Sequence, residues 1–437
     1  MVWLLLLYGL VLIGIGLLDA RRAGDFGSFV LAGRNRGPMM VGGSILASVV
    51  GASATLGVAD LAYQVGFPAF WWLGSGAVGL LVCGFLLAGK IYSLKVYTLA
   101  DLVQKLIGPS ARIAVSLVVV AGWTGIAAAQ LVAASKIVAS LSGWNYPVAL
   151  TLGASCIILY SILGGQISVL KTDSIQLAIL LAGLSLTLWI LYFSSGVPIG
   201  DMDIGFLNES FGMRSFWYFL LVVGSGFVIG PDILSRLFSA RDARAAGRSA
   251  IFSGFLLMAI SCGIVFIGLW GRQFVDLPAG ASILPWILEH KVPFWLGTLL
   301  SFGLLSAIIS SSDTCLMSAA AIFEHDLLGG TRVWSTRLII LALGVGAAFI
   351  AGLEGDIIST LLLAYSLFNC GVIPPVLVAV TAWPAKRLRQ DMVILAVLAG
   401  GGIGIAGKIL DSELITLAGM GLSLLLSLLA LRGEDSA

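Results

Sequence analysis

Charged and metal-binding side chains are scarce in this chain of 437 residues. Only 11% of its residues are charged, whereas 59% are hydrophobic. Ordinary soluble domains carry about 25% charged residues. The mean hydropathy is +1.06. A water-soluble fold could not hide so much apolar surface, so the composition indicates an integral membrane protein with the lipid bilayer as a partner.

The shortage of charge also excludes whole classes of function. Lys and Arg number 24 against 22 Asp and Glu, and a net charge of +2 leaves no basic surface for nucleic acid. The two histidines and five cysteines show no metal-ligand spacing. Because the cysteines are odd in number and all lie in apolar runs, we expect free, buried thiols. They are Cys83, Cys156, Cys262, Cys315 and Cys370.

Long apolar runs are what the sequence has in abundance. A bilayer-crossing helix needs about 20 mostly apolar residues, because hydrocarbon cannot satisfy an exposed backbone. Thirteen ranges meet this need: 2–19, 38–65, 68–92, 112–141, 146–164, 166–195, 216–238, 248–270, 292–325, 333–352, 356–380, 391–408 and 412–431. The first could instead be a signal peptide, but Arg21 and Arg22 follow its apolar stretch rather than precede it. An uncleaved first span is therefore favoured.

The positive charges indicate how these spans face. Nineteen of the 24 Lys and Arg, Arg236 among them, fall in one set of alternate loops. The other side has Lys136, Arg214, Arg272, Lys291 and Lys408. We expect the protein to lie in the cell (inner) membrane. By the positive-inside rule, its N-terminus is outside the cell and its C-terminus is in the cytoplasm. Since the loops are short, we expect one transmembrane domain over residues 1–437, working as a monomer.

Two of the spans are interrupted by helix-breaking residues. The second carries four glycines, Gly51 among them, and the seventh contains Gly230-Pro231. Close packing with a kink would explain either span alone. Spans five apart cross in opposite directions, however, and a matched pair of broken helices is typical of inverted-repeat transporters. The repeats would be 38–195 and 216–380, flanked by 1–37 (first helix and cytoplasmic loop) and 391–437 (two peripheral helices).

Buried acids and hydroxyls mark a candidate site. A carboxylate at a helix centre costs roughly 2.5–3.5 kcal/mol on insertion scales, so it usually faces a cavity, an ion or a partner. Asp173 and Asp313 lie well inside the sixth and ninth spans, and positions 307, 310, 311 and 314 share one helical face. The alternative is a packed interface of serines bonded to their own helix. Asp60 could pair with a lysine or bind a cationic substrate, and Asp232 most simply caps the half-helix after Pro231.

Four segments resemble the sodium:solute symporter family. They are FVLAGRNRGP (29–38), YSILGG with TDSIQ (160–176), PDILSRLFSARDARAA (231–246) and SAIISSSDTCLMSAAAIFEHDL (306–327). The likeness runs in order over about residues 25–380. It implies an all-α membrane protein of about 13 helices, with the LeuT-type 5+5 inverted repeat and discontinuous second and seventh helices. It further implies sodium-driven uptake of a small organic solute, such as an amino acid or carboxylate, by alternating access.

The resemblance also implies site residues, for one or two sodium ions. The first sodium would meet backbone oxygens and hydroxyls of Ala47, Val50, Ala307, Ser310 and Ser311. A second cation would meet Asp173, Ser310, Asp313 and Thr314. Substrate positions of the family match Ser53, Ala54, Trp72, Gln130 and Asn369, and a zwitterion or carboxylate would sit at a half-helix N-terminus. Asp313 stands where some relatives have serine, which should strengthen cation binding or admit a proton. Val49 stands where some relatives carry Asp or Asn.

Two other functions compete with sodium symport. One is a proton-coupled transporter of the same fold. The other, from a different class, is an intramembrane aspartyl protease in which Asp173 and Asp313 share a proton. Asp313 lacks the Gly-x-Gly-Asp context of such proteases, and Asp173 lacks a preceding Tyr. We therefore expect a symporter and not an enzyme.

Overall fold

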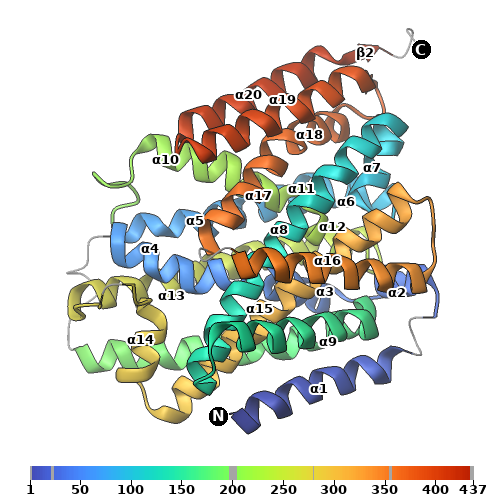
Figure 1. Cartoon of the computed structure of the whole chain (residues 1–437). Coiled ribbons are helices and arrows are strands. Elements are labelled where there is room, and N and C mark those ends of the chain that lie inside the picture. The colour runs from blue at the N-terminus through green and yellow to red at the C-terminus, as the bar shows by residue number, and fades with distance from the viewer. Residues whose placement is uncertain (1, 21–23, 196–203, 279, 354–356, 434–437) are drawn as a thin grey trace.

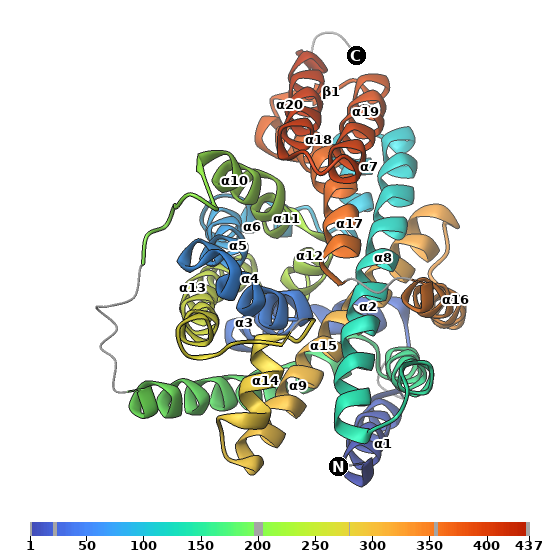
Figure 2. The same ribbon diagram turned by 60° about the vertical axis from the view of Figure 1, so that its left-hand side comes forward.

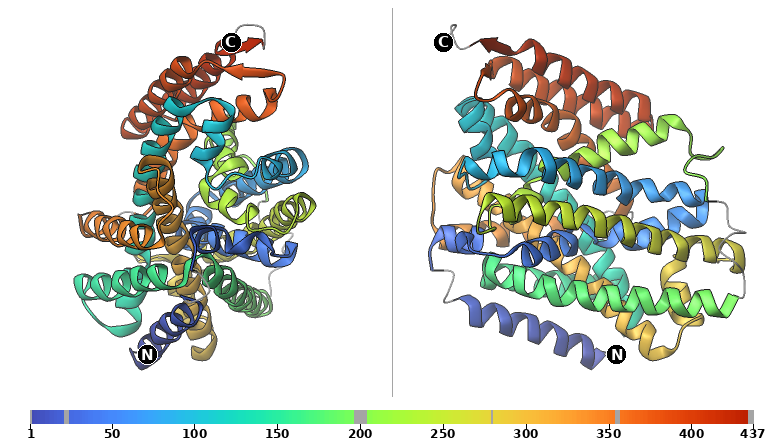
Figure 3. Two further views of the ribbon diagram at one scale, coloured as in Figure 1. Left: turned by 90° about the vertical axis from the view of Figure 1, so that its right-hand side faces the viewer. Right: turned by 180° about the vertical axis from the view of Figure 1, so that it is seen from behind.

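Residues 2–20, 24–195, 204–278, 280–353 and 357–433 are described by the computed structural model, and nearly all of them are helical (Figure 1). Arg21 and Arg22, used above to judge the first span, lie outside the described residues. The helices run roughly alongside one another, with α1 (Val2–Ala20) at one edge and α19 (Gln390–Ile409) and α20 (Glu413–Leu429) at the other (Figures 1, 2 and 3).

The first half of the chain, up to residue 195, forms thirteen of the described elements. After α1 they are α2 (Phe26–Leu31), η1 (Ala32–Arg34), α3 (Pro38–Val49), η2 (Ser53–Gly57), α4 (Val58–Val65), η3 (Phe67–Phe70), α5 (Trp71–Val82), η4 (Cys83–Leu87), α6 (Ala88–Ser93), α7 (Leu99–Leu106), α8 (Pro109–Ser142) and α9 (Tyr146–Ser195).

The second half is also mainly helical and contains a short strand pair. Its elements are α10 (Met213–Tyr218), η6 (Phe219–Val223), α11 (Gly224–Ile229), α12 (Pro231–Leu237), α13 (Ala243–Phe274), α14 (Ile283–His290), α15 (Phe294–Ile322), η7 (Phe323–Leu327), α16 (Val333–Leu353), α17 (Ile357–Gly371), α18 (Ile373–Ala382), β1 (Lys386–Leu388), α19, α20 and β2 (Leu431–Gly433). The strands are antiparallel, with Arg387 opposite Arg432.

Local sequence explains where the long helices begin and end. Helix α8 starts with Pro109 at its first turn, where a missing N–H costs nothing, and stops at Gly143, whose φ of 75° suits glycine. Helix α13 starts at Asp242, whose carboxylate accepts a hydrogen bond from the Ala245 amide at 2.7 Å. These signals fix the ends of two scaffold helices around the centre of the bundle.

Helix α9 contains two of the expected spans, folded back on each other. Gly165 adopts φ 59° and ψ −173°, which no helix allows. The Tyr160 hydroxyl is 2.6 Å from the Thr172 hydroxyl. Twelve residues of straight helix would separate these groups by about 18 Å. The chain therefore reverses at Gly165, between the expected spans 146–164 and 166–195.

Length and composition give ten membrane-crossing helices among the described residues, or eleven when the bent pair Pro38–Val49 and Ser53–Val65 counts as one span. The expected number, thirteen, is not confirmed by this criterion. The difference arises at two places. Helix α9 counts once although it reverses at Gly165, and Glu413–Leu429 has only 17 residues. The all-α membrane architecture itself is confirmed.

Two expectations about individual side chains need correction. All five cysteines are free, but Cys262 is exposed on the helix surface and Cys156 is only half-buried. An apolar run does not tell a lipid-facing side from a packed one, which is why burial was overestimated. Arg236, counted above with the cytoplasmic loops, is instead fully buried on α12. It contributes nothing to the charge of a loop.

Candidate functional site

The second span is broken where its backbone hydrogen bonds are replaced. Helix α3 ends at Val49, and the chain bends by 67° before continuing as η2 and α4. In a continuous helix the Ala52 amide would donate to the Ser48 carbonyl. Here it donates to Gln130 Oε1 of α8 at 3.1 Å. The freed Ser48 carbonyl accepts the Ser311 hydroxyl of α15 at 2.7 Å. The break is thus held open by two neighbouring helices.

Glycine is required at the centre of this break. A Cβ on Gly51 would lie 2.5 Å from Ser311 Oγ and 2.9 Å from Gln130 Oε1, closer than carbon and oxygen can approach. The next turn is a π-helix, Ser53–Gly57, a local distortion that often marks functional sites. The expected discontinuity of the second span is confirmed.

The seventh span is broken by different means. Helix α11 ends at Ile229, Gly230 is extended (φ −57°, ψ 144°), and Pro231 starts α12. The residue before a proline favours this extended conformation. A Cβ on Gly226 would lie 2.9 Å from the Asn369 side-chain amide, so α11 lies close against α17. The expected break at Gly230-Pro231 is confirmed.

Oxygen donors converge beside the first break. Ser311 Oγ donates to Ser48 O and also lies 3.0 Å from Ala307 O. Ser310 Oγ donates to Asp173 Oδ1 at 2.6 Å. With their hydrogens engaged, both hydroxyls keep oxygen lone pairs for a cation. Ala47 and Val50 are buried at the end of α3, so the structure brings together the two stretches from which the expected sodium ligands come.

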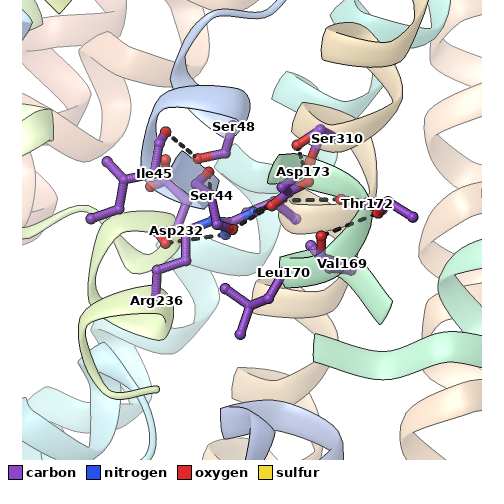
Figure 4. A network of polar contacts seen from close by, with 12 residues as sticks. Ser44, Ile45, Ser48, Val169, Leu170, Thr172, Asp173, Asp232, Arg236 and Ser310 are labelled. Atoms are coloured by element: carbon purple, nitrogen blue, oxygen red, sulfur yellow. Dashed lines mark hydrogen bonds and ion pairs between the residues drawn. The ribbon is translucent and has the colours of Figure 1, made fainter. Parts of the chain in front are cut away.

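Behind these hydroxyls lies a buried ion pair that the sequence did not reveal (Figure 4). Arg236 Nη2 is 3.3 Å from Asp173 Oδ2, and both side chains are fully buried. The Arg236 guanidinium also donates from Nε to Ser44 Oγ at 2.9 Å and from Nη2 to the Thr314 hydroxyl. Ser44 Oγ in turn donates to Asp173. The guanidinium thus ties α12 to α3, α9 and α15.

The expected second cation site is therefore shared with an arginine. Asp173 and Ser310 are bonded to each other, and Thr314 Oγ1 lies 3.2 Å from Asp313 Oδ1. Arg236 bridges the two pairs through Asp173 and Thr314. Its position five residues after Pro231, on a half-helix inside the bundle, is the one signal by which sequence could have found it.

A cavity lies between the two breaks. The first break contributes Ser48, Val49 and Ser53 to its wall, and the second contributes Gly226, Phe227 and Asp232. The scaffold helices complete the lining with Trp123, Ile126, Gln130, Ser311, Cys315, Tyr365 and Asn369. Ser311 thus belongs both to the oxygen donors and to the cavity.

Three of the five expected substrate residues line this cavity, namely Ser53, Gln130 and Asn369. Ala54 and Trp72 are buried but are not among its lining residues. The Trp72 ring packs on Phe219 instead, with the ring centroids 5.6 Å apart. Sequence matching missed Asp232, Trp123 and Tyr365. Asp232 was interpreted as a helix cap, and aromatic residues are too common in membrane spans to stand out.

A helical membrane bundle with two broken spans around a cavity and a row of oxygen donors is a secondary transporter of the LeuT type. The family model for the sodium:solute symporter family matches residues 29–382, and the chain belongs to this family. The chain is thus a sodium-coupled solute symporter, as its motifs predicted.

Known relatives agree with this assignment over most of their length. The sodium/proline symporter of Escherichia coli (strain K12) is 24% identical over 428 residues, which cover 90% of this chain and 84% of the relative. A Na+-coupled sialic acid symporter, solved in a substrate-bound outward-open state, superposes with a TM-score of 0.81 at 15% identity, covering 96% of this chain and 94% of that one. The nucleobase-cation-symport-1 transporter Mhp1 gives a TM-score of 0.65 at 16% identity, with coverages of 92% and 93%.

Proposed function

We propose that one sodium ion binds at the first break, to the backbone oxygens of Ala47, Val50 and Ala307 and the hydroxyls of Ser310 and Ser311. Neutral oxygens of this kind suit a small monovalent cation. The observation that carries the proposal is the 2.7 Å bond from Ser311 Oγ to the freed Ser48 carbonyl, because this bond joins the end of α3 to α15.

Coupling follows from the residue that the two sites share. Ser311 lies in the wall of the cavity, which we assign to the solute. An ion that orders Ser311 and the end of α3 therefore also orders the solute wall, and a bound solute returns the same stabilisation to the ion. Alternating access would then move the two repeats around the shared site.

Replacing the hydroxyls tests this proposal. In Ser311→Ala and Ser310→Ala proteins, sodium-driven uptake into proteoliposomes should need a markedly higher sodium concentration. Ser312→Ala is the matched control, because among the described residues Ser312 Oγ bonds only to its own helix, at Ile308 O (2.8 Å). Sodium affinity that is equal in all three variants would remove the site.

The ion pair argues against a second sodium ion beside Asp173. Arg236 already supplies the positive charge that Asp173 needs, so a second metal ion between them would face a guanidinium. Asp313 remains. It is buried, accepts a long hydrogen bond from the Thr314 hydroxyl at 3.2 Å, and forms no salt bridge among the described residues. An uncompensated carboxylate at this depth is costly, so it would hold a proton or a second cation.

This observation favours proton coupling at Asp313 as a second candidate function. If a proton moves with the solute, an inward proton gradient without sodium should drive uptake by the wild type and not by Asp313→Asn. If uptake ignores the proton gradient in both proteins, Asp313 has a structural role or binds a cation.

An aspartyl protease is not supported by the geometry. Two carboxylates that share a proton must face each other. The oxygens of Asp173 are instead bonded to Ser44, Ser310 and Arg236.

The solute is proposed to be a small organic molecule such as an amino acid or carboxylate, in line with the proline and sialic acid named for two relatives. We further propose a functional monomer in the cell (inner) membrane, with the N-terminus outside. Removing the buried Arg236 leaves 18 basic residues against five, so the charge asymmetry keeps its sign.

A further inference from the structure

The cavity is lined by a carboxylate, that of Asp232, which forms no salt bridge within the part of the chain that the structure describes. Asp232 lies in the first turn of α12 and lines the cavity. Cys315 and Tyr365 line the same cavity. Among the described residues, Asp232 forms no salt bridge, because the neighbouring Arg236 pairs with Asp173 and reaches only the backbone carbonyl of Asp232, at 3.3 Å.

A second acceptor without a partner lies in the same wall. Asn369 is completely buried on α17, and its Nδ2 donates to Val222 O at 2.6 Å. A carbonyl can only accept, so the amide nitrogen must face Val222 and the amide oxygen must face away. That oxygen, Oδ1, is buried and has no hydrogen-bond partner within the described ranges. An unpaired buried acceptor costs about 1–3 kcal/mol, so a donor from outside the chain is the natural partner.

The rest of the lining agrees with a positively charged guest of modest size. The rings of Trp123, Phe227 and Tyr365 line the cavity, and aromatic faces attract cations. Trp123 Nε1 is a buried donor that finds no hydrogen-bond partner among the described residues. No Lys or Arg lines the cavity.

We propose that the solute carries a protonated amine, which is held by the Asp232 carboxylate and the Asn369 amide oxygen. This proposal rests on the proposed function, because it takes the cavity beside Ser311 as the solute site. It also revises the expectation that a carboxylate sits at the half-helix N-terminus, because Asp232 itself already brings a carboxylate into the first turn of α12. These two acceptors would select molecules that carry an amine over molecules of the same shape that lack an amine.

Matched pairs of compounds test this selection. The melting temperature of the purified transporter is measured in sodium with glycine, alanine, valine, phenylalanine and proline, each against its des-amino partner: acetate, propionate, isovalerate, 3-phenylpropionate and cyclopentanecarboxylate. We expect at least one amine to stabilise the protein more than its partner. Asp232→Asn should lower the affinity for that amine by roughly 30-fold or more, since a buried charge pair loses one member. Asn369→Leu should also lower the affinity for the same amine, although Asp232 is intact.

Controls separate this proposal from the sodium site. Asp60→Asn removes a carboxylate bonded to Ser282 Oγ and the Ile283 amide, away from the cavity lining, and should keep the preference for amines. Sodium alone, without solute, should stabilise the wild type and Asp232→Asn equally. Three results would overturn the proposal: no amine stabilises, the des-amino acids bind as well, or Asp232→Asn retains the preference. Loss of the sodium effect in the wild type would instead count against the sodium site.

Discussion

The two broken spans differ in what holds them open. At the first break the backbone groups are satisfied by side chains from elsewhere, Gln130 for the Ala52 amide and Ser311 for the Ser48 carbonyl. At the second break, Pro231 itself lacks the amide hydrogen that a continuous helix would use. The half-helix that it starts carries two charged residues, Asp232 in the first turn and Arg236 in the last. The first break therefore offers neutral oxygens, whereas the second offers charges.

This difference fits a division of labour. A monovalent ion that must bind and leave within each cycle is served by neutral oxygens, because a charged ligand would hold it too tightly. A fixed guanidinium can anchor a half-helix permanently, and a free carboxylate beside it can select a solute by charge. Substitutions that remove charges at the second break should therefore have effects different from substitutions that disturb the neutral oxygens of the first.

The largest effect is expected from breaking the anchor of the second half-helix. Arg236→Gln would leave Asp173 buried beside Ser44 and Ser310 without its ion pair. Removing one member of a buried pair costs about 3–5 kcal/mol. We expect a large fall in melting temperature and in the yield of folded protein.

The double variant Arg236→Gln with Asp173→Asn controls this result. Because it removes both charges, it should recover most of the lost stability. If the double variant is no more stable than Arg236→Gln, the two charges are not coupled and the anchor is not electrostatic.

A smaller effect is expected from filling the first break. Gly51→Ala would push against Ser311 and Gln130, and overpacking of this kind typically costs about 1–3 kcal/mol. Since Ser311 is a proposed ligand, the apparent sodium affinity should fall with the stability. Gly43→Ala, on the preceding helix α3, is the matched control, because the nearest neighbour of its new Cβ would be Ser174 Oγ at 3.8 Å. Equal sodium affinity in both variants would show that the break tolerates a side chain.

Sequence alone predicted the parts of the site that depend on backbone chemistry. Gly51 and Gly230-Pro231 mark both breaks because glycine and proline disrupt helices wherever they lie. The hydroxyl face of Ser310 and Ser311 follows from helical spacing alone. The same logic found the apolar spans, and Gly165 separates two of them at the position where the ranges were divided.

The features of the site that sequence did not predict depend on tertiary contacts, which leave no local pattern in the sequence. Arg236 resembles a loop arginine in a row of basic residues, and only the fold shows that α12 carries it into the core. The free oxygen of Asn369 is identified by what Val222 accepts, 147 residues away. Cys262 lies in an apolar run like Cys83, yet one faces outward and the other is packed inside.

The smallest effect is expected from Pro231→Ala, which tests whether the second break is local or tertiary. Loss of the proline should cost less than about 1 kcal/mol through the flexibility of the unfolded chain. Transport should persist, because Arg236 ties α12 to α3, α9 and α15 whether or not residue 231 has an amide hydrogen. Pro109→Ala, at the ordinary helix start of α8, sets the scale for a proline without such a role. If Pro231→Ala instead stops sodium-driven uptake while the fold survives, the proline itself maintains the second break. The second break would then depend on this one residue, whereas the first depends on contacts with two other helices.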